Sequence, residues 1–222
     1  MYNVRIISAF VLGLFLLGCK IGTVSAQAIQ VAPDKASDFI QQLGTKALTL
    51  VEAQQQGITR DGPGLGDLVR DNFDLDQMGR LTLGSAVQSA TPDQIQEYQT
   101  LFARWMASSY VMFLPTHRVE FRVVRVHPFG IADALVDSVI DRRGRPPLTA
   151  TWRVEDSGGQ MKISDVLFDG VSLMKVKQEE FASVMRNDGG LPGLLGALKK
   201  VVANLEAETA RGSAGASAGV AP

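Results

Sequence analysis

The sequence has very little of the chemistry that catalytic and metal sites usually use. It contains one cysteine, Cys19, and two histidines, His117 and His127, among 222 residues. A single cysteine cannot form an internal disulfide, and no pair of Cys or His residues has the short spacing of a metal site. Each histidine lies beside a proline, so we predict that both are solvated turn residues. We therefore expect no catalytic residues, no metal and no cofactor.

Long apolar runs are also lacking after the N-terminus. The first 26 residues contain Arg5, an apolar run over 6–17 and the small residues Val24-Ser25-Ala26, which is the pattern of a secretory signal. The run is shorter than the roughly 20 residues that a membrane-spanning helix needs. We predict that residues 1–26 are a signal peptide and that the mature chain is exported and soluble. The alternative is a lipoprotein anchored at Cys19, because 16–19 also resembles a lipobox.

An excess of positive charge is absent as well. The chain has 22 Lys and Arg against 23 Asp and Glu, and the signal contains basic residues only, so the mature chain is more acidic still. Nucleic acid is therefore not expected as a partner. Hydrophobic residues make up 45% of the chain, which excludes a wholly disordered or fibrous protein. We predict one domain over residues 27–210 and a disordered tail over 211–222.

Apolar residues recur at helical spacing in the first half and at the end of the chain. Thr91-Pro92-Asp93-Gln94 combines an N-cap, a proline at the first helical position and a capping-box partner, and it opens the longest of the central helices. The spacing predicts helices over about 34–56, 68–73, 75–83, 92–113, 173–187 and 191–210. Gly62-Pro63-Gly64-Leu65-Gly66 lacks the lysine of a phosphate-binding loop, and we interpret it as a connector.

After Pro115 the apolar period changes to two. This alternation predicts four strands near 119–123, 134–140, 148–154 and 161–168. The links at 127–130, 142–146 and 157–159 are short and rich in turn residues, which favours consecutive hairpins. The predicted fold class is α+β, with a twisted antiparallel four-stranded sheet and helices packed on one of its faces.

Large apolar side chains are the most informative group in this arrangement. The long helix offers several on one side, and the strands offer more. A curved sheet roofed by a helix is a common place for an apolar pocket. We expect such a cavity to be lined by Phe102, Trp105, Met106, Phe121, Leu135, Val139, Trp152 and Ile163. The alternative is that these residues form a filled core.

One pair of acidic residues lies at the end of the last strand. Asp165 and Asp169 could form a buried acid pair of the kind that acid–base catalysis uses. We favour the interpretation that Asp165 pairs locally and that Asp169 forms the turn before Gly170.

Several stretches resemble the MlaC family, the periplasmic lipid carriers also called toluene-tolerance proteins. They are 73–78 followed by Leu83-Gly84, 99–102 with Tyr110, Lys162-Ile163-Ser164-Asp165-Val166, Asp169-Gly170-Val171-Ser172-Leu173 and the Gly-Leu-rich segment 189–198. The resemblance spans roughly residues 34–202. It implies an NTF2-like, MlaC-like fold around an apolar cavity, and a monomeric, non-enzymatic carrier in the periplasm. Such a carrier passes lipid between an inner-membrane ABC lipid transporter complex and an outer-membrane acceptor or donor complex.

Two departures from the family pattern bear on the cargo. Met161 stands where the family usually has tryptophan, and Val176-Lys177-Gln178 stands where it has Asn-Tyr-Arg. These departures point to the hopanoid-associated HpnM branch, so the implied ligand is a phospholipid or a hopanoid. The polar segments best placed to meet a partner are the hairpin 142–145 and residues 169–178, and the alternative for the hairpin is a solvated tip with no partner. The alternatives are a cone-shaped, NTF2-like enzyme acting on a small hydrophobic substrate, and a structural envelope adaptor.

Overall fold

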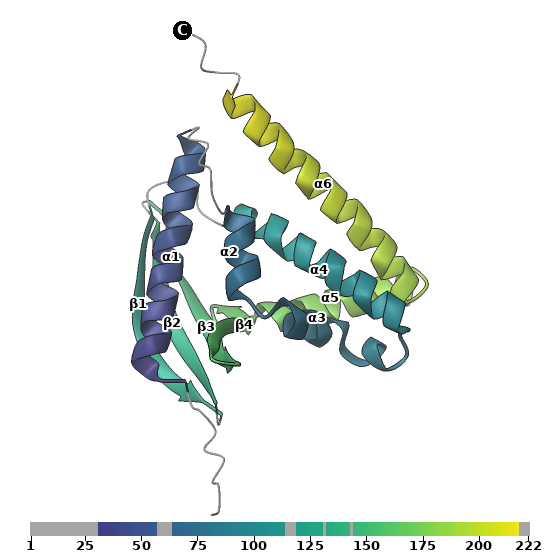
Figure 1. Cartoon of the computed structure of the whole chain (residues 1–222), viewed down its shortest axis with the longest axis horizontal. Coiled ribbons are helices and arrows are strands. Elements are labelled where there is room, and N and C mark those ends of the chain that lie inside the picture. Colours follow the sequence, from purple (N-terminus) through teal and green to yellow (C-terminus); the bar gives the residue numbers. More distant parts are fainter. Residues whose placement is uncertain (1–30, 57–63, 114–118, 131, 143, 218–222) are drawn as a thin grey trace, which may run out of the picture.

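The computed structural model describes residues 31–56, 64–113, 119–130, 132–142 and 144–217. The expected signal peptide, Cys19 and His117 lie outside the described residues. The described chain has two parts, an antiparallel sheet with helix α1 lying along it and a lobe of helices beside the sheet (Figure 1). No helix among the described residues is long and apolar enough to cross a membrane.

The sheet is an antiparallel meander in which each strand pairs with the next. Its strands are β1 (Val119–Phe129), β2 (Asp133–Arg142), β3 (Leu148–Ser157), β4 (Gln160–Phe168) and β5 (Val171–Ser172). The four predicted strands are present in the predicted order. The segment 127–129 was expected to be a link, but it belongs to β1, where Pro128 pairs with Ala134. A proline is tolerated there because β1 is an edge strand.

The fifth strand corrects the predicted count of four. Asp169 and Gly170 both have positive φ, 49° and 82°, as the central residues of a tight hairpin turn require. The turn returns the chain onto β4, where Ser172 pairs with Leu167 and Val171 pairs with Phe168. A strand of two residues is too short for apolar alternation to reveal, so the sequence indicated only a turn leading into a helix.

The helices begin and end close to the predicted residues. They are α1 (Pro33–Gln55), α2 (Leu65–Asn72), α3 (Leu75–Leu83), the 3-10 helix η1 (Gly84–Gln88), α4 (Pro92–Phe113), α5 (Leu173–Asn187) and α6 (Leu191–Ser217). The capping box of α4 is confirmed, because Gln94 N donates to Thr91 Oγ1 (3.2 Å) and Thr91 N donates to Gln94 Oε1 (3.0 Å). Helix α6 continues to Ser217, beyond the expected end near Ala210.

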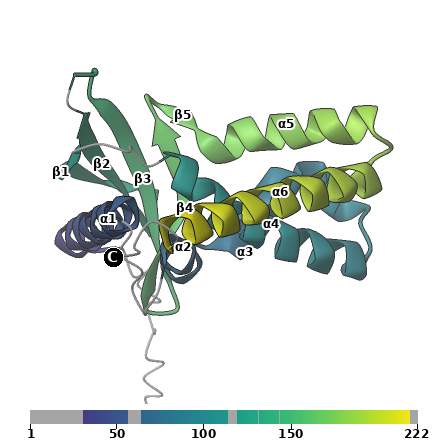
Figure 2. The same ribbon diagram turned by 90° about the horizontal axis from the view of Figure 1, so that it is seen from above.

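The helices are not all layered on the sheet. Helix α1 lies along β1 and β2, and α2 lies between the sheet and α4 (Figures 1 and 2). The main contacts of α4 are with α2, α3 and α6, so the long helix does not roof the sheet as predicted. Helix α2 contacts α4, with Gly66 next to Ala107, and it contacts β4 on its other side, so α2 lies between α4 and the strands. Two ion pairs, Arg104–Glu206 and Lys199–Glu97, join α4 to α6.

Candidate functional site

An apolar cavity lies where α1 and α2 face the sheet. Its volume is about 50 Å³, which is room for about four water-sized groups. Ordinary ligand pockets have roughly 300–1,000 Å³, so the described residues do not enclose the lipid-sized cavity expected from the sequence. Apolar side chains and one glycine line the cavity, namely Ile40, Leu43, Gly44, Ala47, Leu48, Leu65, Leu68, Val69, Phe73, Phe121, Ile140 and Trp152.

Helical periodicity places the lining residues of α1 on one side. Ile40, Leu43 and Ala47 follow one another at three- and four-residue spacing, and all three are buried. Leu68 and Val69 extend the wall along α2. The α1 spacing was recognised as a helix face but was not assigned to the cavity, and the lining residues of α2 were missed. Short helices such as α2 have too few turns to show which partner their apolar face contacts.

Two of the predicted cavity residues line this cavity. Phe121 on β1 and Trp152 on β3 contact each other edge to face, with ring centroids 6.3 Å apart. The indole Nε1 of Trp152 donates to Ser138 Oγ (2.8 Å), and Ser138 Oγ donates to the carbonyl of Ala150 (3.1 Å). The buried polar atom of Trp152 is therefore satisfied on the strand side, and its hydrocarbon face is left to the cavity.

Ile163 lies in the core beside the cavity rather than in its wall. Its side chain is fully buried, and its carbonyl accepts a hydrogen bond from Asp74 N (2.9 Å). The adjoining residue Phe73 forms an isolated bridge with Ile163 and does line the cavity.

The three predicted residues of the long helix pack among helices. Phe102 and Trp105 have ring centroids 5.7 Å apart, and Trp105 lies edge to face against Phe181 of α5 at 6.0 Å. Met106 is buried with them in the core, and none of the three lines the cavity. Since α2 separates α4 from the sheet, the structure places these side chains in the core of the helical lobe.

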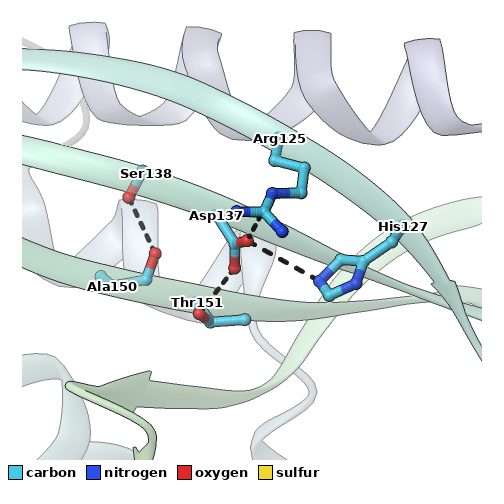
Figure 3. Close-up of polar contacts among 6 residues, drawn as sticks. All are labelled: Arg125, His127, Asp137, Ser138, Ala150 and Thr151. Atoms are coloured by element: carbon cyan, nitrogen blue, oxygen red, sulfur yellow. Dashed lines mark hydrogen bonds and ion pairs between the residues drawn. The ribbon is translucent and has the colours of Figure 1, made fainter.

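Leu135 and Val139 lie on the opposite face of β2 from the cavity. Val136 and Ile140 alternate with them, and Ile140 is a lining residue. Asp137 lies between Leu135 and Val139 on the same face of β2 (Figure 3). Its carboxylate accepts a hydrogen bond from Thr151 Oγ1 (2.7 Å) and forms an ion pair with Arg125 Nε (3.6 Å). The set of β2 that contains Leu135 and Val139 also contains Asp133, Asp137 and Asp141, whereas the other set contains Ala134, Val136, Ser138 and Ile140. The prediction weighed the large apolar side chains and not the three carboxylates that alternate with them, so it chose the wrong face.

The remaining polar candidates have structural partners. Asp165 accepts hydrogen bonds from Ser172 Oγ (2.5 Å) and Met174 N (3.2 Å), which fixes the start of α5, and Asp169 accepts from Thr149 Oγ1 (2.7 Å) in the β4–β5 turn. They do not form an acid pair. His127 is in β1 rather than in a turn, and its side chain is 45% exposed beside Asp137 (Figure 3). No cluster of three potential metal ligands occurs within the part of the chain that the structure describes.

Glu155 on β3, away from the cavity, is the described carboxyl group whose pKa is raised. Desolvation is the largest cause, and it raises the pKa of Glu155 above its usual value. Folding therefore favours the protonated form, so stability falls as pH rises from the unfolded pKa, about 4.3, through the folded pKa.

We expect Glu155→Gln to raise the free energy of unfolding at pH 7 by up to about 1 kcal/mol and to have no effect well below pH 4. Urea unfolding at both pH values checks this. The same change at the exposed Glu52 is the control. An equal change in the free energy of unfolding at both pH values would contradict desolvation of the charged Glu155 as the cause.

A family model described as MlaC protein matches residues 41–200. The chain belongs to the MlaC family. Among solved structures, the fold is similar to that of a phospholipid-binding protein from Ralstonia solanacearum, determined in complex with a phospholipid. That match has a TM-score of 0.58 and 24% sequence identity, and it covers 75% of this chain and 98% of the other. As in MlaC proteins, helices and an antiparallel sheet form one mixed fold, and in this MlaC chain the sheet has five strands.

Proposed function

We propose that the protein is a periplasmic lipid carrier, exported by residues 1–26, that encloses the apolar part of one lipid between α1, α2 and the sheet. It would act as the soluble component of an ABC-type lipid transport system. The observation that carries the proposal is the entirely apolar lining of the cavity in a chain of the MlaC family. The Ralstonia protein of similar fold was solved with a phospholipid, which supports this class of ligand.

The cavity must widen to hold such a cargo. A lipid chain contains many more groups than the about 50 Å³ between α1, α2 and the sheet can take. When a lipid is loaded, α1 and α2 move away from the sheet. The methylene groups of the lipid then replace the side-chain contacts that are lost between these elements. A closed empty form keeps this apolar surface away from water, which would otherwise be a site of aggregation.

Release of the cargo requires a partner. Each buried methylene contributes about 0.8 kcal/mol, so a chain of ~15 methylenes opposes escape into water by roughly 12 kcal/mol. We propose that an inner-membrane ABC lipid transporter complex and an outer-membrane complex supply or accept the lipid by direct contact. Among the described residues of the hairpin 142–145, the Arg142 guanidinium donates a hydrogen bond to the carbonyl of Pro146 (2.7 Å), and Arg145 is exposed.

The test is organic extraction of the natively purified protein, followed by mass spectrometry. We expect about one lipid per chain, and the mass distinguishes a phospholipid from a hopanoid. Recovery of lipid-free, monodisperse protein from cells in which the envelope is intact would contradict a carrier. In that case an enzyme of the cone-shaped type or a structural adaptor would be favoured.

A further inference from the structure

Helix α1 approaches the sheet unusually closely at one lining residue, Gly44. A Cβ atom built on Gly44 would overlap the ring of Phe121, meeting three of its carbon atoms within 2.7 Å, whereas real Cβ contacts are not closer than 3.0 Å. Gly44 is therefore required for α1 and the Phe121 ring to lie together as they do. Glycine is otherwise unfavourable inside a helix by about 1 kcal/mol relative to alanine.

A second contact holds the same part of α1 on the sheet. The amide side chain of Gln41 accepts a hydrogen bond from Val123 N (2.9 Å) and donates one to the carbonyl of Phe121 (3.4 Å). These backbone groups belong to the outer edge of β1, because β2 is the only strand of the described residues that pairs with β1. One glutamine thus supplies the two hydrogen bonds that a neighbouring strand would supply.

The Phe121 ring has close neighbours on two sides. The backbone of Gly44 lies on one side, and the indole of Trp152 lies edge to face against the ring on another. The cavity also lies next to the ring. Any group that is added at Gly44 can therefore be accommodated by turning the ring into the cavity or by lifting α1 and breaking the Gln41 hydrogen bonds.

We infer that Gly44, Phe121 and Gln41 are specificity-determining residues that set the width of the cavity. They admit one flexible alkyl chain, which can enter past the Phe121 ring, and they exclude a rigid fused-ring lipid, which needs α1 to leave the edge of β1. This inference rests on the proposed function and narrows its ligand class.

The first experiment is Gly44→Ala, with Gly196→Ala as the matched control. Gly196 is also in a helix, but a Cβ added there meets nothing within 4 Å. Turning the ring into the cavity is the cheaper response, so Gly44→Ala should lower the phospholipid bound per protein by about tenfold or more. Adding Phe121→Leu to Gly44→Ala should restore binding, because the smaller side chain leaves room for the added methyl group. Normal loading of Gly44→Ala, or no recovery in the double variant, would overturn the inference.

The second experiment is Gln41→Leu, with Gln42→Leu as the matched control. Gln42 is exposed on the same helix. Each purified protein is incubated with vesicles of equal parts phosphatidylglycerol and dehydroergosterol, a rigid fused-ring probe, and is then separated and analysed by native mass spectrometry. We expect sterol to bind only to Gln41→Leu, together with faster hydrogen exchange at the Val123 amide. Sterol bound by the wild-type protein, or none bound by Gln41→Leu once exchange is faster, would contradict a width set by these residues.

Failure of this inference and failure of the proposed function give different results. If the wild-type protein takes up no lipid of either kind, the carrier function is wrong. If it takes up phospholipid and the variants behave like their controls, the carrier function stands and the assignment of Gly44, Phe121 and Gln41 is wrong.

Discussion

Replacing Ile140 by glutamate is expected to remove lipid from the purified protein, whereas the same change at the neighbouring Val139 is expected to leave the protein loaded. Ile140 lines the cavity, and Val139 lies on the opposite face of β2. A carboxylate without a partner in an apolar site costs several kcal/mol, so the lipid affinity of Ile140→Glu should fall by more than about tenfold. Extraction and mass spectrometry of both variants measure the difference.

The two variants differ by one position in the same strand, so each controls for the other. Circular dichroism and thermal melting should show that both are folded. Equal lipid content in Ile140→Glu and Val139→Glu would mean that the cargo does not occupy this side of the sheet. Loss of lipid in Val139→Glu alone would place the cargo on the face that carries Asp137.

Replacing Phe102 by alanine is expected to have the largest effect on stability without changing lipid binding. The Phe102 side chain is fully buried and contacts the rings of Tyr98 (5.8 Å) and Trp105 (5.7 Å) in the helical lobe. Large-to-alanine changes at such sites cost about 3–5 kcal/mol. Urea unfolding measures the loss, and extraction at low temperature measures lipid per folded protein.

Phe129→Ala is the control for Phe102→Ala. Phe129 is 43% exposed, and its ring is covered in part by the Arg153 guanidinium, 5.0 Å from the ring centroid. We expect a loss of about 1 kcal/mol or less. If Phe102→Ala keeps its stability but loses its lipid, Phe102 lines the cargo site, as the sequence first indicated, and the assignment to the core is wrong.

Local signals were sufficient for most of the secondary structure. The capping box at Thr91 and Gln94 and the glycines after α5 act within a few residues, so the sequence shows where α4 begins and where α5 ends. Alternation similarly located β2 and β3. The MlaC resemblance is borne out by the family match over 41–200.

Arrangement in space was harder to predict, for two physical reasons. An apolar face shows that a helix is buried but not which element buries it, so Phe102 and Trp105 were assigned to the sheet although α2 intervenes. In β2, large apolar side chains occur in both alternating sets, and the aspartates that mark the Leu135 and Val139 set as the outer face were given too little weight. The cavity walls from α1 and α2 depend on this packing, so only Phe121 and Trp152 among the predicted residues were found in them.

The most direct test of the carrier proposal is photo-crosslinking with a phospholipid that has a diazirine near the end of one acyl chain. The protein is loaded, irradiated and digested, and tandem mass spectrometry locates the adducts. We predict adducts on α1 between Ile40 and Leu48, on α2 and at Phe121, Ile140 or Trp152, the residues around the cavity. Adducts confined to Leu135, Val139 or the helical lobe around Phe102 would contradict the proposed binding site.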